Sequence, residues 1–133
     1  MTRQRETTVV PPREAPDYLA KAEEFQRAAS RSLASGDPSA AGMLAIHAGI
    51  TAVDAITIHF LGLRSAGQRH ADAIALVAQT AHPRRADLQR QLNQLISEKK
   101  SVEYEGRRIS SGDSEKMVKL SARIVDAAKE SVR

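Results

Sequence analysis

Hydrophobic residues recur along this chain at the spacing of α-helices rather than at the alternating spacing of strands. The first periodic stretch predicts a helix over about 16–33, ended by Gly36. The next stretch, 39–61, follows the helix-start pair Asp37-Pro38 and is hydrophobic on nearly all sides. A helix of this kind must be covered by neighbours on several sides, so we expect it at the centre of a bundle.

Three more helices are expected after the central one. Ser65 and Gln68 have the spacing of a capping box, which predicts a third helix from about Ala66. A fourth helix is expected to start at His82, and a second capping signal at Ser110 predicts the start of a fifth.

The predicted fold class is therefore all-α, an up-down bundle of four to five helices over 16–133. Residues 1–15 are polar and without a period, and they contain Pro11-Pro12, so we expect them to form a disordered N-terminal tail. Hydrophobic residues make up 41% of the chain but aromatic residues only 3%, so the core must consist mainly of Ala, Leu, Ile and Val. Such a composition favours helix packing over sheets.

Composition also limits the location and the chemistry. The chain has no cysteine, which excludes disulfides, thiolate zinc sites and thiol catalysis. Its N-terminus lacks the hydrophobic stretch of a signal peptide. The most hydrophobic run, 43–63, contains His47, Asp54 and His59, which would be costly inside a lipid bilayer. We therefore expect a cytoplasmic protein that does not enter a membrane.

Charge is unevenly distributed between the two halves of the chain. Residues 1–63 carry six basic and seven acidic residues, whereas 64–133 carry fourteen basic and nine acidic residues. A basic half is compatible with a polyanionic partner such as RNA. An ordinary solvated surface would explain the same charge equally well.

His47, Thr51 and Asp54 form a polar stripe on the expected central helix. Their spacing of i, i+4 and i+7 places them on one face. A buried carboxylate needs a partner. Asp54 therefore either accepts hydrogen bonds from a neighbouring loop, from His47 or from an arginine, or it orients a cationic residue of an active site.

Arg64 and His70 are the best candidates for chemistry, because they flank the expected start of the third helix. Phosphate-binding glycine loops, nucleophile elbows and HExxH motifs are absent from the sequence. Histidine can move a proton near neutral pH, and arginine can bind a phosphate and stabilise its developing charge. No pair of histidines has the context of a metal site, so we expect neither metal nor cofactor.

Topology and motif together resemble the HEPN (higher eukaryotes and prokaryotes nucleotide-binding) superfamily. The segment HAGITAVDAITIHFLGLRS leads into an R-x5-H element, and EKKSVEYEGRRISSGDSEKMVKLSARIV is similar to the last part of small actinobacterial-type members. The resemblance covers about 16–132. It implies a homodimer that brings two motif copies together and cleaves RNA without metal, as the toxins of toxin–antitoxin pairs do.

The resemblance also implies roles for individual residues. Arg64 would contact the scissile phosphate, and His70 would transfer a proton at the ribose 2′-OH or at the leaving oxygen. Ser65 would be the polar residue that follows the arginine. We further expect Asp54 to orient Arg64, with His47 as a supporting residue on the same helix face.

Basic and aromatic residues elsewhere are candidates for binding nucleic acid. These are Arg69, Lys100, Tyr104 and Arg107, which could contact RNA phosphates or stack on a base. The alternative is a solvated helix end with Tyr104 packed as a lid on the core.

Two functions follow from these expectations. The first is an RNA- or nucleotide-binding protein, active as a metal-independent endoribonuclease through Arg64 and His70. The second is a catalytically inactive dimeric module that binds a partner protein such as a nucleotidyltransferase. Two departures from the motif bear on the choice: Ser65 stands where active toxins more often have Asn or Asp, and Asp72 stands where they have Tyr.

Overall fold

A computed structural model describes residues 6–66, 70–99, 106 and 108–133 of the chain. The described residues form five α-helices, a short 3-10 helix and two short strands, so the expected helical bundle is confirmed. The helices are α1 (Ala15–Ala34), α2 (Pro38–Leu61), α3 (His70–Val77), α4 (Arg85–Ser97) and α6 (Ser111–Val132). The other elements are β1 (Thr7–Val9), the 3-10 helix η1 (Pro12–Glu14) and β2 (Leu63–Ser65).

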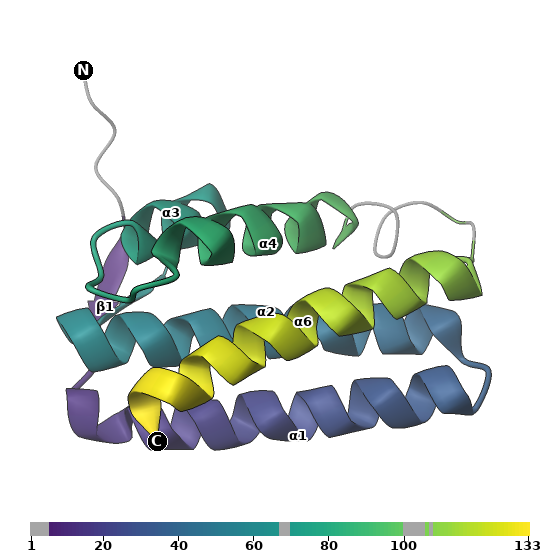
Figure 1. The fold of residues 1–133 in the computed structure, drawn as a ribbon, viewed down its shortest axis with the longest axis horizontal. Coiled ribbons are helices and arrows are strands. Elements are labelled where there is room, and N and C mark those ends of the chain that lie inside the picture. Colours follow the sequence, from purple (N-terminus) through teal and green to yellow (C-terminus); the bar gives the residue numbers. More distant parts are fainter. Residues whose placement is uncertain (1–5, 67–69, 100–105, 107) are drawn as a thin grey trace.

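The hydrophobic helix α2 is the central element of the bundle, as its sequence predicts. It packs most extensively against α1 and α6, while α1 and α4 lie on opposite sides of the pair α2 and α6 (Figure 1). Among the described helices, α2 alone is long and hydrophobic enough to cross a membrane, but 56% of its most hydrophobic window is buried inside the protein. In this fold α2 is a core helix.

Small residues let the helices approach α2 closely. A methyl group built on Gly49 would overlap the side chain of Leu95 on α4 and would lie 3.5 Å from Ile124 on α6. Gly49 therefore lowers the helix propensity of α2 but permits tight packing of three helices. At the end of α2, Gly62 adopts a left-handed conformation with φ of 66°, and its N–H donates to the Ile58 carbonyl over 2.9 Å.

The N-terminal segment differs from the expected disordered tail over its described part. Residues 7–9 form β1, which pairs antiparallel with β2, and residues 12–14 form η1, which leads directly into α1. Val10 is buried at 6% exposure beside Ala15 and Ile58, so the segment adds a small second core cluster. The prediction was wrong because the segment gains structure only through this tertiary pairing.

The starts of α3 and α4 also differ from the predicted positions. Ser65 does not cap a helix but lies in β2, and α3 begins at His70. α4 begins at Arg85 rather than at His82. His82 is fully buried in the segment before α4. The Arg84 N–H donates to its Nδ1 over 3.0 Å, and its Nε2 lies 3.1 Å from the Ala127 carbonyl oxygen of α6. The capping signal at Ser110 is confirmed, since its hydroxyl accepts from the Asp113 N–H over 3.1 Å.

Candidate functional site

The two-stranded sheet places Arg64 at the end of the bundle where α2 ends. Arg64 is the middle residue of β2 and lies opposite Thr8 of β1. Two further backbone bonds extend the pairing: the Val10 N–H donates to the Gly62 carbonyl over 2.9 Å, and the Ala66 N–H donates to the Glu6 carbonyl over 3.1 Å. Hydrogen bonds before and after Arg64 in the sequence thus fix its backbone against the N-terminal segment, which restricts the directions that its side chain can take.

Arg64 is half-buried, and only some of the N–H groups of its guanidinium have an acceptor among the described residues. Its Nη1 donates to the Ser65 carbonyl oxygen over 3.3 Å. Its Nε is buried and has no hydrogen-bond acceptor among the described residues. A buried donor without an acceptor loses its hydration without compensation, and this is a common feature of groups that serve a ligand.

Asp54 interacts electrostatically with Arg64. It lies in the last third of α2, is half-buried, and forms no ion pair with any described residue. Burial raises the pKa of Asp54 to about 7, and the charge of Arg64 opposes that rise. Asp54 therefore titrates near neutral pH, and its electrostatic effect on Arg64 changes over the same range.

His70 is the first residue of α3 and is half-buried. α3 packs against β2, so the fold brings the strand of Arg64 and the helix of His70 together. Asp72, also in the first turn of α3, is buried at 7% exposure. A carboxylate in the first turn interacts favourably with the helix dipole and reduces the partial positive charge that the helix offers to a ligand.

The polar stripe on α2 does not act as one unit. His47 is exposed, and its ring lies 5.8 Å from the ring of Phe25 on α1. Asp54 is about 10 Å further along the helix axis. His47 therefore packs on the surface of α1. Among the described residues, no contact supports the role that was expected for it beside Asp54. Thr51 is half-buried between the two residues.

Several predicted residues lie outside the described part of the chain. These are Arg69, Lys100, Tyr104 and Arg107. Ser65 is described: it is half-buried in β2, and its carbonyl oxygen accepts the bond from Arg64. Among the described residues, His, Asp and Glu side chains do not gather in a group of three that could hold a metal ion.

The sequence matches no protein-family model and no curated protein.

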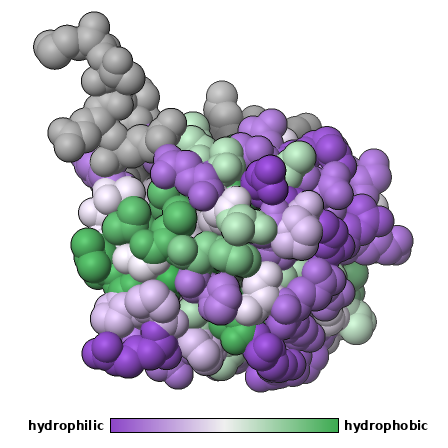
Figure 2. Space-filling model, turned by 60° about the vertical axis from the view of Figure 1, so that its left-hand side comes forward, coloured by the Kyte–Doolittle hydropathy of each residue, from purple (hydrophilic) through white to green (hydrophobic). Residues whose placement is uncertain are grey.

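The contribution of the N-terminal segment to the site is what sequence reasoning missed. Thr7, Thr8, Val9 and Val10 form a run of β-branched residues, a composition typical of strands, and this signal could have revealed β1. Figure 2 shows hydrophobic surface gathered at the end of the molecule where β1 lies. Val9 is 79% exposed, the highest value of any large hydrophobic residue in the described chain.

Proposed function

We propose that this protein is an RNA-binding protein of the HEPN type that cleaves RNA as a homodimer in the cytoplasm, with Arg64 and His70 in its active site. One observation carries the proposal: Arg64 is held in a strand beside α3 with a buried Nε that has no acceptor among the described residues. A phosphate oxygen would be a suitable acceptor if binding turns the Arg64 side chain so that its buried Nε becomes accessible, because arginine binds phosphate through two of its donors at once.

The proposed reaction needs only groups of this chain. The imidazole of His70 takes the proton of a ribose 2′-OH, and the 2′ oxygen forms a bond to the phosphorus while the bond from phosphorus to the 5′ oxygen breaks. The leaving 5′ oxygen takes a proton from the imidazolium that this transfer leaves on His70, and a 2′,3′-cyclic phosphate remains on the first fragment. Arg64 stabilises the added negative charge on the phosphate oxygens.

Asp54 would position Arg64 rather than contact RNA. When it is ionised, it attracts the guanidinium towards α2, and when it is protonated, that attraction is lost. The rate of cleavage should therefore depend on the ionisation of both Asp54 and His70.

A homodimer would use the hydrophobic end of the molecule. Val9 is exposed on β1, one residue from the partner of Arg64 in the sheet. Figure 2 shows further hydrophobic surface at this end, and a contiguous exposed hydrophobic patch is typical of interaction sites. Val9 and its partner Leu63 point to the face of the sheet opposite to Thr8 and Arg64, so a dimer through Val9 would not by itself bring two Arg64 side chains together.

The test is cleavage of a single-stranded RNA in the presence of EDTA, by the wild-type protein and by Arg64→Ala and His70→Ala. Both variants should lose at least about a hundredfold in rate, because each removes a group from the reacting centre. Arg31→Ala, at an exposed position of α1, is the matched control and should cleave normally. Equal cleavage by folded His70→Ala would refute the proposal, as would cleavage that requires a metal ion.

The alternative function is a catalytically inactive dimeric module that binds a partner protein. The exposed Val9 favours it as well as the dimer, because the same surface could receive a different chain. This function predicts no turnover of RNA and full tolerance of His70→Ala. It predicts loss of association in Val9→Glu, measured as solution mass.

A further inference from the structure

The strand β1 has an outer edge whose backbone groups bond to no other described segment. Backbone hydrogen bonds alternate along an antiparallel strand, so every second residue faces the neighbouring strand. The Glu6 carbonyl and the Val10 N–H both bond to the segment that contains β2. The backbone N–H and carbonyl groups of Thr7 and Val9 therefore point away from β2. Among the described residues, neither Thr7 nor Val9 takes part in a backbone bond outside the sheet.

This edge has the composition and the exposure of a strand that can pair again. Natural proteins usually protect a strand edge with charged residues, prolines or bulges. β1 consists instead of the uncharged residues Thr7, Thr8 and Val9, all of which are β-branched and favour strands. Thr7 is exposed and Val9 is 79% exposed, so a further strand can approach β1 from the side away from β2.

The outward groups match an antiparallel second copy of β1. Each copy offers an N–H and a carbonyl at Thr7 and again at Val9, on either side of Thr8. If two copies run antiparallel with Thr8 opposite Thr8, then Thr7 of each copy faces Val9 of the other, and each such pair exchanges two hydrogen bonds. All outward groups of both strands are then paired. A register with Val9 opposite Val9 would place Thr7 opposite Pro11, which has no N–H to donate.

Side chains near this edge can extend the contact. Residues that lie opposite each other share a face of the sheet, so Val9 would lie beside Thr7 of the second copy, and the two Val9 side chains would be diagonal neighbours. Strands of three residues bury little area compared with the roughly 1,200 Å² or more of a stable interface. The hydrophobic surface around β1 is available to supply the remainder (Figure 2).

We propose that two copies of this chain associate through β1 and form one four-stranded antiparallel sheet in the order β2-β1-β1-β2, with the two Thr8 residues at its two-fold axis. Arg64 lies opposite Thr8, so both Arg64 residues line the same face of this sheet, with their backbones three strand spacings or about 14 Å apart. The inference rests on the homodimer of the proposed function and specifies its surface, but it does not depend on RNA cleavage.

Cross-linking through single cysteines tests the register, because the chain has no cysteine of its own. In the proposed sheet the two Thr8 residues lie about 4.5 Å apart at Cα, which a disulfide can span. The two Thr7 residues, and likewise the two Val9 residues, are diagonal at about 7 to 8 Å, which a disulfide spans poorly. Thr8→Cys should therefore form oxidised dimers at least about tenfold faster than Thr7→Cys or Val9→Cys. Random collision would favour the reverse order, because Thr8 is the least exposed of the three.

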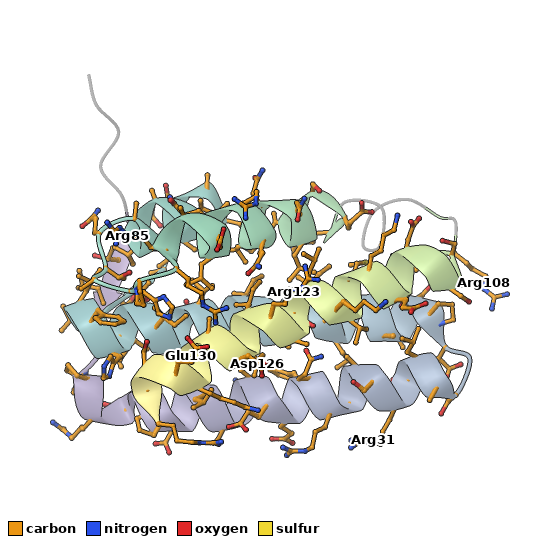
Figure 3. The ribbon with its side chains drawn as sticks, viewed as in Figure 1. Arg31, Arg85, Arg108, Arg123, Asp126 and Glu130 are labelled. Atoms are coloured by element: carbon orange, nitrogen blue, oxygen red, sulfur yellow. The ribbon has the colours of Figure 1, made fainter. Side chains whose placement is uncertain are left out.

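Two further variants and a control complete the test. Arg108→Cys is the matched control, because Arg108 is exposed at the end of the molecule opposite to β1 (Figure 1 and Figure 3), and it should cross-link only at the background rate. Val9→Pro removes an N–H that points away from β2, so the protein should keep its helical circular dichroism but become monomeric by light scattering. Val9→Thr keeps both the N–H and the β-branched shape, and it should remain dimeric.

Three outcomes would overturn the proposal: a wild-type chain that stays monomeric at high concentration, equal oxidation rates at the four cysteine positions, or a folded Val9→Pro that remains dimeric. RNA cleavage separates this inference from the proposed function. Rapid cross-linking of Thr8→Cys together with an absence of cleavage by the wild type would support the β1 interface and refute the ribonuclease. Cleavage by a dimer that does not cross-link through position 8 would support the ribonuclease and refute the β1 interface.

Discussion

Replacement of Asp54 by asparagine tests whether this carboxylate is held in the folded protein at an electrostatic cost. Asparagine has nearly the same shape and resembles the protonated acid, but it cannot ionise. The carboxylate is half-buried on α2, and its pKa rises from 3.8 to about 7, because burial disfavours the charged form more than Arg64 favours it. The substitution therefore removes the ionisation while it keeps most of the packing.

The sign of the effect follows from proton binding. Between pH 4 and pH 7 the folded protein keeps the Asp54 proton and the unfolded chain has released it, so the free energy of unfolding falls as the pH rises. The stabilisation from Asp54 is complete below the unfolded pKa and is lost as the pH rises through the folded pKa. A rise from 3.8 to about 7 corresponds to at most about 4 kcal/mol between pH 4 and pH 8.

The assay is urea unfolding of wild type and Asp54→Asn, followed by circular dichroism at several pH values. The two proteins should be similarly stable near pH 4, and Asp54→Asn should be more stable by about 2 to 4 kcal/mol at pH 8. Asp126→Asn is the matched control, because its side chain is 68% exposed, and its difference from wild type should stay nearly constant with pH.

Removal of Arg64 sharpens the same test. Arg64 lowers the pKa of Asp54, so Arg64→Gln should raise that pKa further and extend the loss of stability to higher pH. The double variant should lose this dependence. Parallel stability curves for wild type and Asp54→Asn would refute the account of a strained carboxylate beside Arg64.

Three substitutions test the packing that positions the site, each by urea unfolding. His82→Ala should cost about 3 kcal/mol, because it leaves a cavity and removes the ring contacts with the Ala127 carbonyl and the Arg84 N–H, while the exposed His59→Ala should cost little; equal stability of the two would contradict the buried role of His82. Gly49→Ala should cost about 1 to 3 kcal/mol, since its methyl group overlaps Leu95, and a gain in stability from the higher helix propensity of alanine would show that α4 can move away. Ser110→Ala should cost about 1 kcal/mol through the lost N-cap bond, and an equal cost in Ser111→Ala would show that the cap is not its cause.

Local signals predicted the long helices well. The hydrophobic period of α1, Pro38 at the start of α2 and the capping serine of α6 each act within a few residues, so the sequence contains them directly, whereas the expected cap Asp37 makes no side-chain cap bond. The central position of α2 also follows from its sequence, because a helix that is hydrophobic on nearly all sides must be covered. Gly49 allows the close approach of α4, because a methyl group there would overlap Leu95.

Features that depend on long-range pairing could not be predicted in this way. Ser65 has a helix-capping pattern, but β1 binds its segment as a strand from more than fifty residues away. His47 shares a helix face with Asp54, yet its ring faces the surface of α1, because the position of a neighbouring helix decides which part of a face is buried. His82 carries a signal for a helix start, but its ring is used to join the loop before α4 to α6.

The pairing of β1 with β2 changes how the candidate site should be understood. Sequence reasoning treats Arg64 as a residue of the turn between two helices, where its side chain would have many directions open to it. In the structure the strand fixes its backbone opposite Thr8, and the fold places α3 against the same strand. A two-stranded sheet is only marginally stable in isolation, so its persistence here depends on the packing of Val10 beside Ala15 and Ile58. The first residues of the chain and the end of the central helix therefore cooperate to hold one arginine. The position of the Arg64 backbone therefore depends on the tertiary fold, and the R-x5-H spacing alone does not determine it.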